Sequence, residues 1–186
     1  MCQARIYSAS QDGFTLIEIL ITLLILAVGL MGLAGLQARM LNTQFEAYQR
    51  AQAVMLAEDM ASRLRTNIVA SRAATYAVTT QYGTGNSLGD AACTSNDDLC
   101  VWSQALKGIS VKQGAQALGS MIGARGCLQT VSGSATSQQV IRVTVVWQGL
   151  TPTVAPASTC GKDTYGGDDR LRRAVSVDVT LAYLGV

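Results

Sequence analysis

The chain has 186 residues, almost half of them apolar, with 14 Lys and Arg against 12 Asp and Glu. A formal net charge of +2 without a basic stripe argues against nucleic acid binding. Histidine is absent, which removes the commonest general base and the commonest zinc ligand. The sequence also has no phosphate-binding glycine loop and no Cys-x-x-Cys pair. We therefore expect a protein that is not an enzyme and uses no metal and no cofactor.

The first predicted element is an apolar helix from Phe14 to Leu36, in which Glu18 is the one charged residue. These 23 residues would measure about 34 Å as a helix, which is enough to cross a bilayer core of about 30 Å. A carboxylate in a membrane span costs roughly 2.5 to 3.5 kcal/mol at the centre and less toward the edge. Glu18 is therefore expected to have a partner, the alternative being a side chain that reaches the headgroups alone.

The start of this helix resembles the class III signal of type IV prepilins and pseudopilins. The motif residues stand together, as Gly13, Phe14, Thr15, Leu16, Ile17 and Glu18. The resemblance implies that a prepilin peptidase cleaves between Gly13 and Phe14 and methylates the new amine of Phe14. Asp12 departs from the family pattern, in which many members have a basic or neutral residue before the glycine. A conventional secretory signal cut after Ala34 is the alternative, and the charge of Glu18 argues against it.

Cleavage would leave the Phe14 amine and the Glu18 carboxylate about 6 Å apart along one helix. An axially shifted second subunit could bring its own amine to Glu18, and burying the two charges together offsets part of their desolvation. Glu18 is thus predicted to set the assembly register.

Three glycines, Gly29, Gly32 and Gly35, interrupt the apolar half, and each costs roughly 1 kcal/mol relative to alanine in a helix. They predict the softest part of the helix. Two explanations remain open: close helix packing in a membrane, or a segment that loosens in a filament, as the resemblance to pilins implies.

The helical pattern continues beyond the apolar run. Large apolar side chains recur at spacings near three and four, at Leu41, Phe45, Tyr48, Met55, Leu56, Met60, Leu64 and Ile68. Glu46 with Arg50, and Asp59 with Arg63, have the i,i+4 order of an exposed helix face. We predict one helix from about 14 to about 72, whose second half lies on its own globular domain.

Residues 73–89 are polar and predict a loop, and 99–106 predict a short helix with Trp102 and Leu106 on one face. Three strands follow, a first over 127–131 and two with period-two alternation over 141–147 and 175–183. One-sided alternation predicts an antiparallel sheet covered by the amphipathic half of the helix, so the fold class is α+β.

Five cysteines are present. Cys2 precedes the motif, and the other four follow the apolar run at Cys93, Cys100, Cys127 and Cys160. An even number suits two disulfides in an oxidising compartment, whereas buried thiols of a cytosolic protein are the alternative. Three pairings are possible, and the spacing favours the first with the second and the third with the fourth.

Charge leaves the orientation open, since Arg5 precedes the span while Arg39 and Arg50 follow it. Paired cysteines place the C-terminal part outside the cytoplasm. We therefore expect an inner-membrane protein with its N-terminus inside and a periplasmic C-terminal domain, which becomes part of an extracellular pilus after assembly. The expected segments are a leader (1–13), a transmembrane and assembly half-helix (14–38), an amphipathic half-helix (39–72) and a globular domain (73–186).

The polar segment from Cys160 to Arg173 contains Asp163, Asp168 and Asp169 beside three arginines. A weak calcium site and an interaction surface for another pilin are alternatives, but the spacing fits no EF-hand. Solvated turns and salt bridges are the prediction.

Beyond the motif, the chain resembles the PilV-type minor pilins, or type IV pilus modification proteins. The shared features are dispersed, at Val28 to Leu30, Gly126 and Cys127, Val143 to Trp147, Cys160 and Gly161, Tyr165 and Gly166, and Arg172 to Val175. This implies a subunit that primes pilus assembly within a minor-pilin complex at or near the tip, supporting adhesion and twitching motility. The implied partners are other minor pilins, the major pilin, the prepilin peptidase and the inner-membrane assembly platform.

Rival interpretations are a minor pseudopilin of a type II secretion system and a single-pass membrane-anchored periplasmic binding protein. A pseudopilin for DNA uptake is a weaker variant because the chain has no basic stripe.

Overall fold

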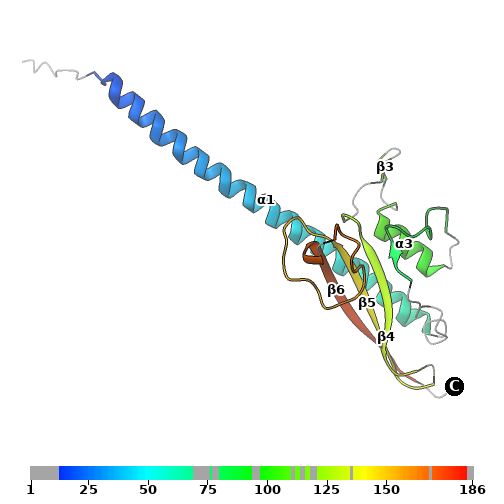
Figure 1. The fold of residues 1–186 in the computed structure, drawn as a ribbon. Coiled ribbons are helices and arrows are strands. Elements are labelled where there is room, and N and C mark those ends of the chain that lie inside the picture. Colours follow the sequence, from blue (N-terminus) through cyan, green and yellow to red (C-terminus); the bar gives the residue numbers. More distant parts are fainter. Residues whose placement is uncertain are drawn as a thin grey trace, which may run out of the picture. The chain divides into compact units, whose positions relative to one another are not determined.

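In a computed structural model, the described residues are 13–68, 76, 80–93, 97–109, 112–113, 116–117, 121–134, 136–167 and 169–183. The chain divides into two compact units, residues 1–43 and 44–186. The elements follow in the order α1 (Leu16–Thr66), β1 (Tyr82–Gly83), α3 (Asp98–Lys107), β2 (Lys112–Gln113), β3 (Gln116–Ala117), β4 (Arg125–Ser132), β5 (Gln139–Gln148), the 3-10 helix η1 (Asp169–Leu171) and β6 (Arg172–Leu181) (Figure 1). Residues 69–72 of the predicted long helix lie outside the described residues, and α1 ends at Thr66.

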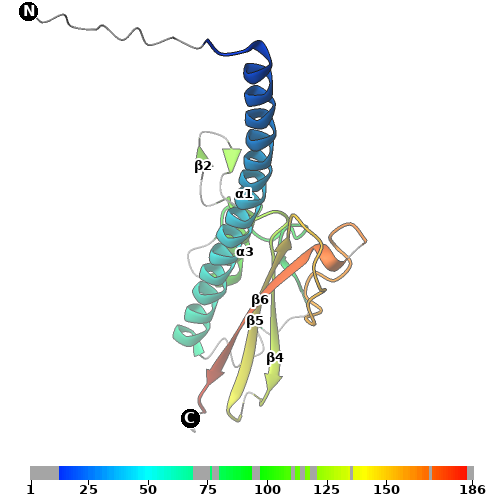
Figure 2. The ribbon, with the colours of Figure 1, turned by 90° about the vertical axis from the view of Figure 1, so that its left-hand side faces the viewer.

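The second unit has a four-stranded antiparallel sheet in the order β1-β4-β5-β6. All ten residues of β5 pair with β6, and β4 lies along its other edge, so that β4, β5 and β6 run side by side in Figure 2. The alternating residues Ile141, Val143, Val145 and Trp147 are buried in one core together with residues of α1. The predicted α+β architecture is therefore confirmed. β6 ends before Tyr183, which was predicted to be in the strand and is 45% exposed.

The buried face of α1 differs from the predicted stripe. Its buried residues are Gln49, Ala53, Ala57, Met60, Ala61 and Leu64. Of the large side chains that we expected inside, Met60 and Leu64 are buried and Leu56 is partly buried. Leu41, Phe45, Tyr48, Met55 and Ile68 are exposed, so that part of the prediction is wrong. The spacing of three and four is kept, but alanines occupy it because a small side chain lets a helix approach its neighbours closely.

The predicted loop over 73–89 contains the short strand β1, which pairs with β4. Tyr82 of β1 is buried, and its ring lies 5.9 Å from the ring of Trp102, centroid to centroid. The predicted short helix is confirmed as α3, which Asp97 caps by accepting the N–H of Cys100 and which Gly108 ends at a φ of 71°. The stretch predicted as a loop therefore contributes a short strand with a buried tyrosine to the sheet.

Candidate functional site

The N-terminal motif begins with three residues that precede the helix, Gly13, Phe14 and Thr15, all of them exposed. The Thr15 hydroxyl accepts the N–H of Glu18 at 3.3 Å, and the Thr15 carbonyl accepts it at 3.1 Å. Thr15 is therefore the N-cap of α1, and Thr15-x-x-Glu18 has the sequence of a capping box. Our sequence reasoning missed this role, although Ser or Thr followed three residues later by Glu before an apolar run signals it. Residues 1–12, the rest of the predicted leader, lie outside the described residues.

Glu18 occupies the first turn of α1, where the helix dipole favours a negative charge. Its side chain is exposed and makes no ion pair within the described part of the chain. The carboxylate is thus open to a cation from outside the chain. The local cap and a contact with another subunit are two separate roles that this one residue can fill.

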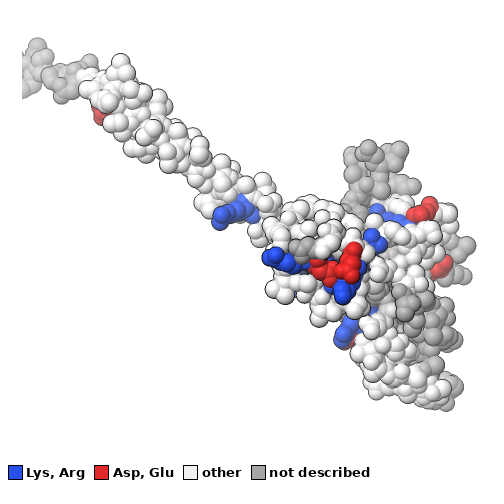
Figure 3. All heavy atoms as spheres, in the orientation of Figure 1, with Lys and Arg blue, Asp and Glu red and all other residues white. Residues whose placement is uncertain are grey.

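The apolar part of α1 is long and apolar enough to cross a membrane, and none of its most apolar window is buried within the protein. On the face seen in Figure 3, the first part of the helix carries almost no charge. The helix runs without a break through Gly29, Gly32 and Gly35, and a Cβ placed on any of them would meet nothing within 4 Å. The packing of this chain therefore gives no reason for glycine at these positions.

A second apolar stripe lies on the part of α1 within the second unit. Phe45, Tyr48 and Met55 are 44%, 61% and 71% exposed. They follow helical spacing beside the buried alanine face rather than on it. This part of the helix therefore has one apolar face against its own sheet and another in solvent.

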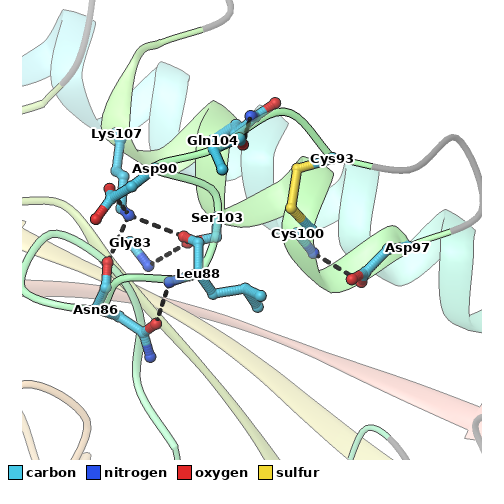
Figure 4. The surroundings of a disulfide bond; sticks show 11 residues. Gly83, Asn86, Leu88, Asp90, Cys93, Asp97, Cys100, Ser103, Gln104 and Lys107 are labelled. Carbon is cyan, nitrogen blue, oxygen red and sulfur yellow. Dashed lines mark hydrogen bonds and ion pairs between the residues drawn. A yellow bond between two sulfur atoms is a disulfide. The ribbon is translucent and has the colours of Figure 1, made fainter.

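Two disulfides are present, one joining Cys93 to Cys100 and one joining Cys127 to Cys160. The first ties α3 to the segment before it (Figure 4). Beside it, the Lys107 ammonium donates to the carbonyls of Asn86 and Leu88 and to the Asp90 carboxylate. The Ser103 hydroxyl donates to the Leu88 carbonyl and accepts the N–H of Gly83. These contacts hold residues 83–90 against α3.

The longer bridge is expected to contribute more stability than the shorter one. By loop-closure entropy, replacing Cys127 and Cys160 with serine should lower the free energy of unfolding by about 4 kcal/mol, and the same change at Cys93 and Cys100 by about 2 kcal/mol. The loops close over 33 and 7 positions. Denaturant titration of the two double variants in detergent tests this order. An equal or reversed order would contradict the entropic account.

The segment from Cys160 to Arg173 contains a salt bridge, as predicted, but the arginine of this bridge is buried rather than solvated. Arg172 is 2% exposed and lies 2.7 Å from Asp169. The hydrogen bonds from Arg172 lower the pKa of Asp169. Asp168 lies outside the described residues, and among those described no group of three or more His, Cys, Asp or Glu side chains is placed to hold a metal ion.

A polar network joins α1 to α3. The Arg63 guanidinium donates to Asp98 at 3.1 Å and to Asp59 at 3.0 Å, and the Tyr76 hydroxyl donates to Asp98 at 2.9 Å. Burial acts to raise the pKa of Asp98, but hydrogen bonds from Tyr76 and Arg63 outweigh it and lower that pKa. Burial, followed by the hydrogen bond and charge of Asp98, raises the pKa of Tyr76 to about 12.

These two shifts predict how the stability of the globular unit depends on pH. The lowered pKa of Asp98 stabilises the fold above about pH 4, and this is lost as the pH falls through the folded-state value. The raised pKa of Tyr76 stabilises the fold below about pH 10, and this is lost as the pH rises toward about 12. Denaturant midpoints measured across pH should therefore fall at both ends. Tyr76→Phe should weaken the alkaline fall, and an unchanged alkaline limb in that variant would contradict the assignment.

Comparison with known protein families gave two matches in consecutive segments. The prokaryotic N-terminal methylation motif matches residues 8–34, and the family described as type IV pilin Tt1218 matches residues 35–106. No curated protein and no solved structure matches the chain. The two matches cover the motif at Gly13 to Glu18, the rest of α1, and α3, and the structure has a long apolar N-terminal helix followed by an antiparallel sheet. The chain is therefore a type IV pilin-like protein.

Proposed function

We propose that this protein is a minor pilin of the PilV type, which helps to prime type IV pilus assembly within a minor-pilin complex at or near the tip. In this role it supports adhesion and twitching motility. It acts by templating, so its chemistry is the pairing of charges and apolar surfaces between subunits. Its partners are other minor pilins, the major pilin, the prepilin peptidase and the inner-membrane assembly platform.

One observation carries the proposal: an N-terminal methylation motif leads directly into the apolar part of α1, where Glu18 is the one carboxylate and has no ion-pair partner within the described residues. An amine created at Phe14 by cleavage after Gly13 is the complementary charge. Within one helix, the Phe14 amine competes with the N-terminal cap for the Glu18 carboxylate. Between shifted subunits, each charge instead gains a new partner. Glu18 thereby sets the register of neighbouring subunits.

The exposed stripe of Phe45, Tyr48 and Met55 supports contact with further subunits. Apolar side chains of this size in one row are costly in water unless a neighbour covers them. The buried alanine face of the same helix is already covered by its own sheet. A helix of another pilin-type subunit is the partner that fits this stripe.

Several of the features shared with PilV-type proteins have defined structural roles in this chain. Gly126 lies against Trp102, Cys127 is bonded to Cys160, and the Tyr165 hydroxyl donates to the Gly123 carbonyl at 2.8 Å. These contacts give the shared residues a structural purpose in this chain, which supports the PilV-type assignment.

Processing is the first test. The protein should be extracted from membranes of cells with and without an active prepilin peptidase, and its mass measured. We expect the loss of thirteen residues, one methyl group on Phe14 and four oxidised thiols in the first case, and an intact Met1 in the second. An intact Met1 in both would overturn the proposal and favour a permanently anchored binding protein.

Cell behaviour is the second test. Deleting the gene should reduce the number of surface pili and abolish twitching, and a plasmid copy should restore both. Secretion through the type II system should be unaffected. Loss of that secretion with normal piliation would instead assign the protein as a minor pseudopilin.

A further inference from the structure

Arg172 opens β6 and is almost completely buried. Its guanidinium donates to both carboxylate oxygens of Asp169, at 3.2 and 2.7 Å. It also donates to three backbone carbonyls, those of Pro156 at 3.2 Å, Ser158 at 2.5 Å and Cys160 at 2.9 Å. An arginine has five N–H donors in a rigid fork, and these five hydrogen bonds use them all. All donors of the side chain are thus satisfied. We call these five hydrogen bonds the Arg172 clamp.

The three carbonyls belong to alternate residues of the segment that ends at Cys160. One guanidinium therefore sets the path of the chain over residues 156–160. Arg172 itself pairs with Gln148 of β5, and Cys127 pairs with Thr144 of the same strand. Backbone pairing with β5 therefore positions both Arg172 and Cys127, and this pairing does not require the disulfide.

Chain entropy alone does not select Cys160 as the partner of Cys127. Cys127 is separated from Cys160 by 33 positions and from Cys100 by 27, so the two loops cost nearly the same to close. α3, which carries Cys100, packs its Trp102 against Gly126, the neighbour of Cys127. Selection of the correct partner needs a contact that acts on Cys160.

We propose that Arg172 is a positioning residue for oxidative folding, whose guanidinium holds Cys160 against Cys127 before the disulfide forms. In this step the two thiols lose two protons and two electrons as the S–S bond is made. A disulfide oxidant such as oxidised glutathione takes up both and is cleaved into two thiols. The clamp raises the effective concentration of one thiol at the other.

The test uses the full chain in detergent, with Cys2→Ser in every variant so that this thiol cannot compete. The reduced protein is reoxidised with oxidised glutathione, samples are alkylated at intervals, and the pairs are identified by peptide mass spectrometry. Arg172→Lys keeps the charge but loses the fork. It should lower the ratio of Cys127–Cys160 to other pairs of Cys127 by about tenfold. Arg142→Lys is the matched control, since Arg142 forms a two-bond pair with Asp178 between the same two strands without contacting the 156–160 segment.

Formation of the Cys93–Cys100 pair in the same samples reports on the rest of the fold. It should proceed at the same rate in all variants, because the Arg172 clamp does not contact that bridge. An unchanged pairing ratio in Arg172→Lys would overturn the proposal. So would an equal slowing of both bridges, which would mean that Arg172 acts on the whole fold rather than on Cys160.

A second measurement asks whether the clamp stands without the bridge. In a variant with Cys127→Ala and Cys160→Ala, the amide of Lys162 should stay protected from hydrogen exchange, since it donates to the Thr159 carbonyl within the 156–160 segment. Adding Arg172→Lys should lower the protection factor of this amide at least tenfold. Loss of protection while Arg172 is still present would also refute the inference.

Discussion

Replacing Gly126 with alanine is expected to lower the free energy of unfolding of the globular unit by about 3 kcal/mol. A Cβ at this position would overlap Cη2 of Trp102 and approach its Cζ3 to 2.7 Å and Cδ1 of Leu106 to 2.8 Å. The indole cannot move aside freely, because it is fully buried and its Nε1 donates to the Leu56 carbonyl of α1 at 2.9 Å. The clash therefore disturbs the packing at the place where the sheet, α3 and α1 meet. Hydrogen exchange of β5 amides in the full chain in detergent measures the loss.

A double-mutant cycle tests the named contact. Trp102→Phe removes the outer ring that meets Gly126, so Gly126→Ala should cost less in that background, by about 1.5 kcal/mol or more. Gly32→Ala is the control glycine, because nothing lies within 4 Å of its Cβ and the fold of the second unit should not respond. Strictly additive losses at Gly126 and Trp102 would show that another contact explains the glycine.

Replacing Glu18 with glutamine is expected to reduce incorporation of the protein into pili by at least a hundredfold, while cleavage after Gly13 continues. The physical reason is the charge: without it, the Phe14 amine of a neighbouring subunit would be buried without a partner, which costs several kcal/mol. Glutamine is also found at the N3 position of a capping box, three residues after the N-cap, so the helix start is retained. Immunoblots of sheared pili and of membranes, scaled to total processed protein, measure the ratio.

Thr15→Ala is the matched control for the local role of Glu18. It removes the hydroxyl that accepts the Glu18 N–H and should cost about 1 kcal/mol of helix stability, but it keeps the carboxylate. Incorporation should then remain within a few-fold of normal. If Thr15→Ala fails as completely as Glu18→Gln, or if Glu18→Gln assembles normally, the inter-subunit ion pair is wrong and Glu18 serves its own helix.

Much of this architecture was predictable from local patterns. The motif at Gly13 to Glu18 and the apolar run are contiguous, so no long-range information is needed to see them. The alternation of Ile141, Val143, Val145 and Trp147 predicted a one-sided strand, and β5 has these residues buried. The short helix over 99–106 was predicted from Trp102 and Leu106 on one face, and both are buried in α3.

The predictions failed for residues whose burial depends on what packs against them. Phe45, Tyr48 and Met55 are apolar and correctly spaced, yet they face solvent, while Ala53 and Ala57 beside them are buried. Hydrophobicity alone predicts the wrong side chains to be buried, because the helix and its neighbours approach closely only over small residues. The strand β1 was missed for a similar reason: Tyr82 packs near the ring of Trp102, which is twenty positions away in the sequence.

The sequence by itself determined that this chain has an N-terminal methylation motif, one helix fit for a membrane, an even set of cysteines after it and an antiparallel sheet, since each is a motif, a spacing or a count along the chain. Only the tertiary structure decided which face of α1 is covered, that Thr15 caps α1, and that the guanidinium of Arg172 contacts three carbonyls and Asp169 around Cys160. These features depend on distances between groups that no periodicity encodes, because a hydrogen bond or a packed ring is defined only once both partners have been brought together by the fold.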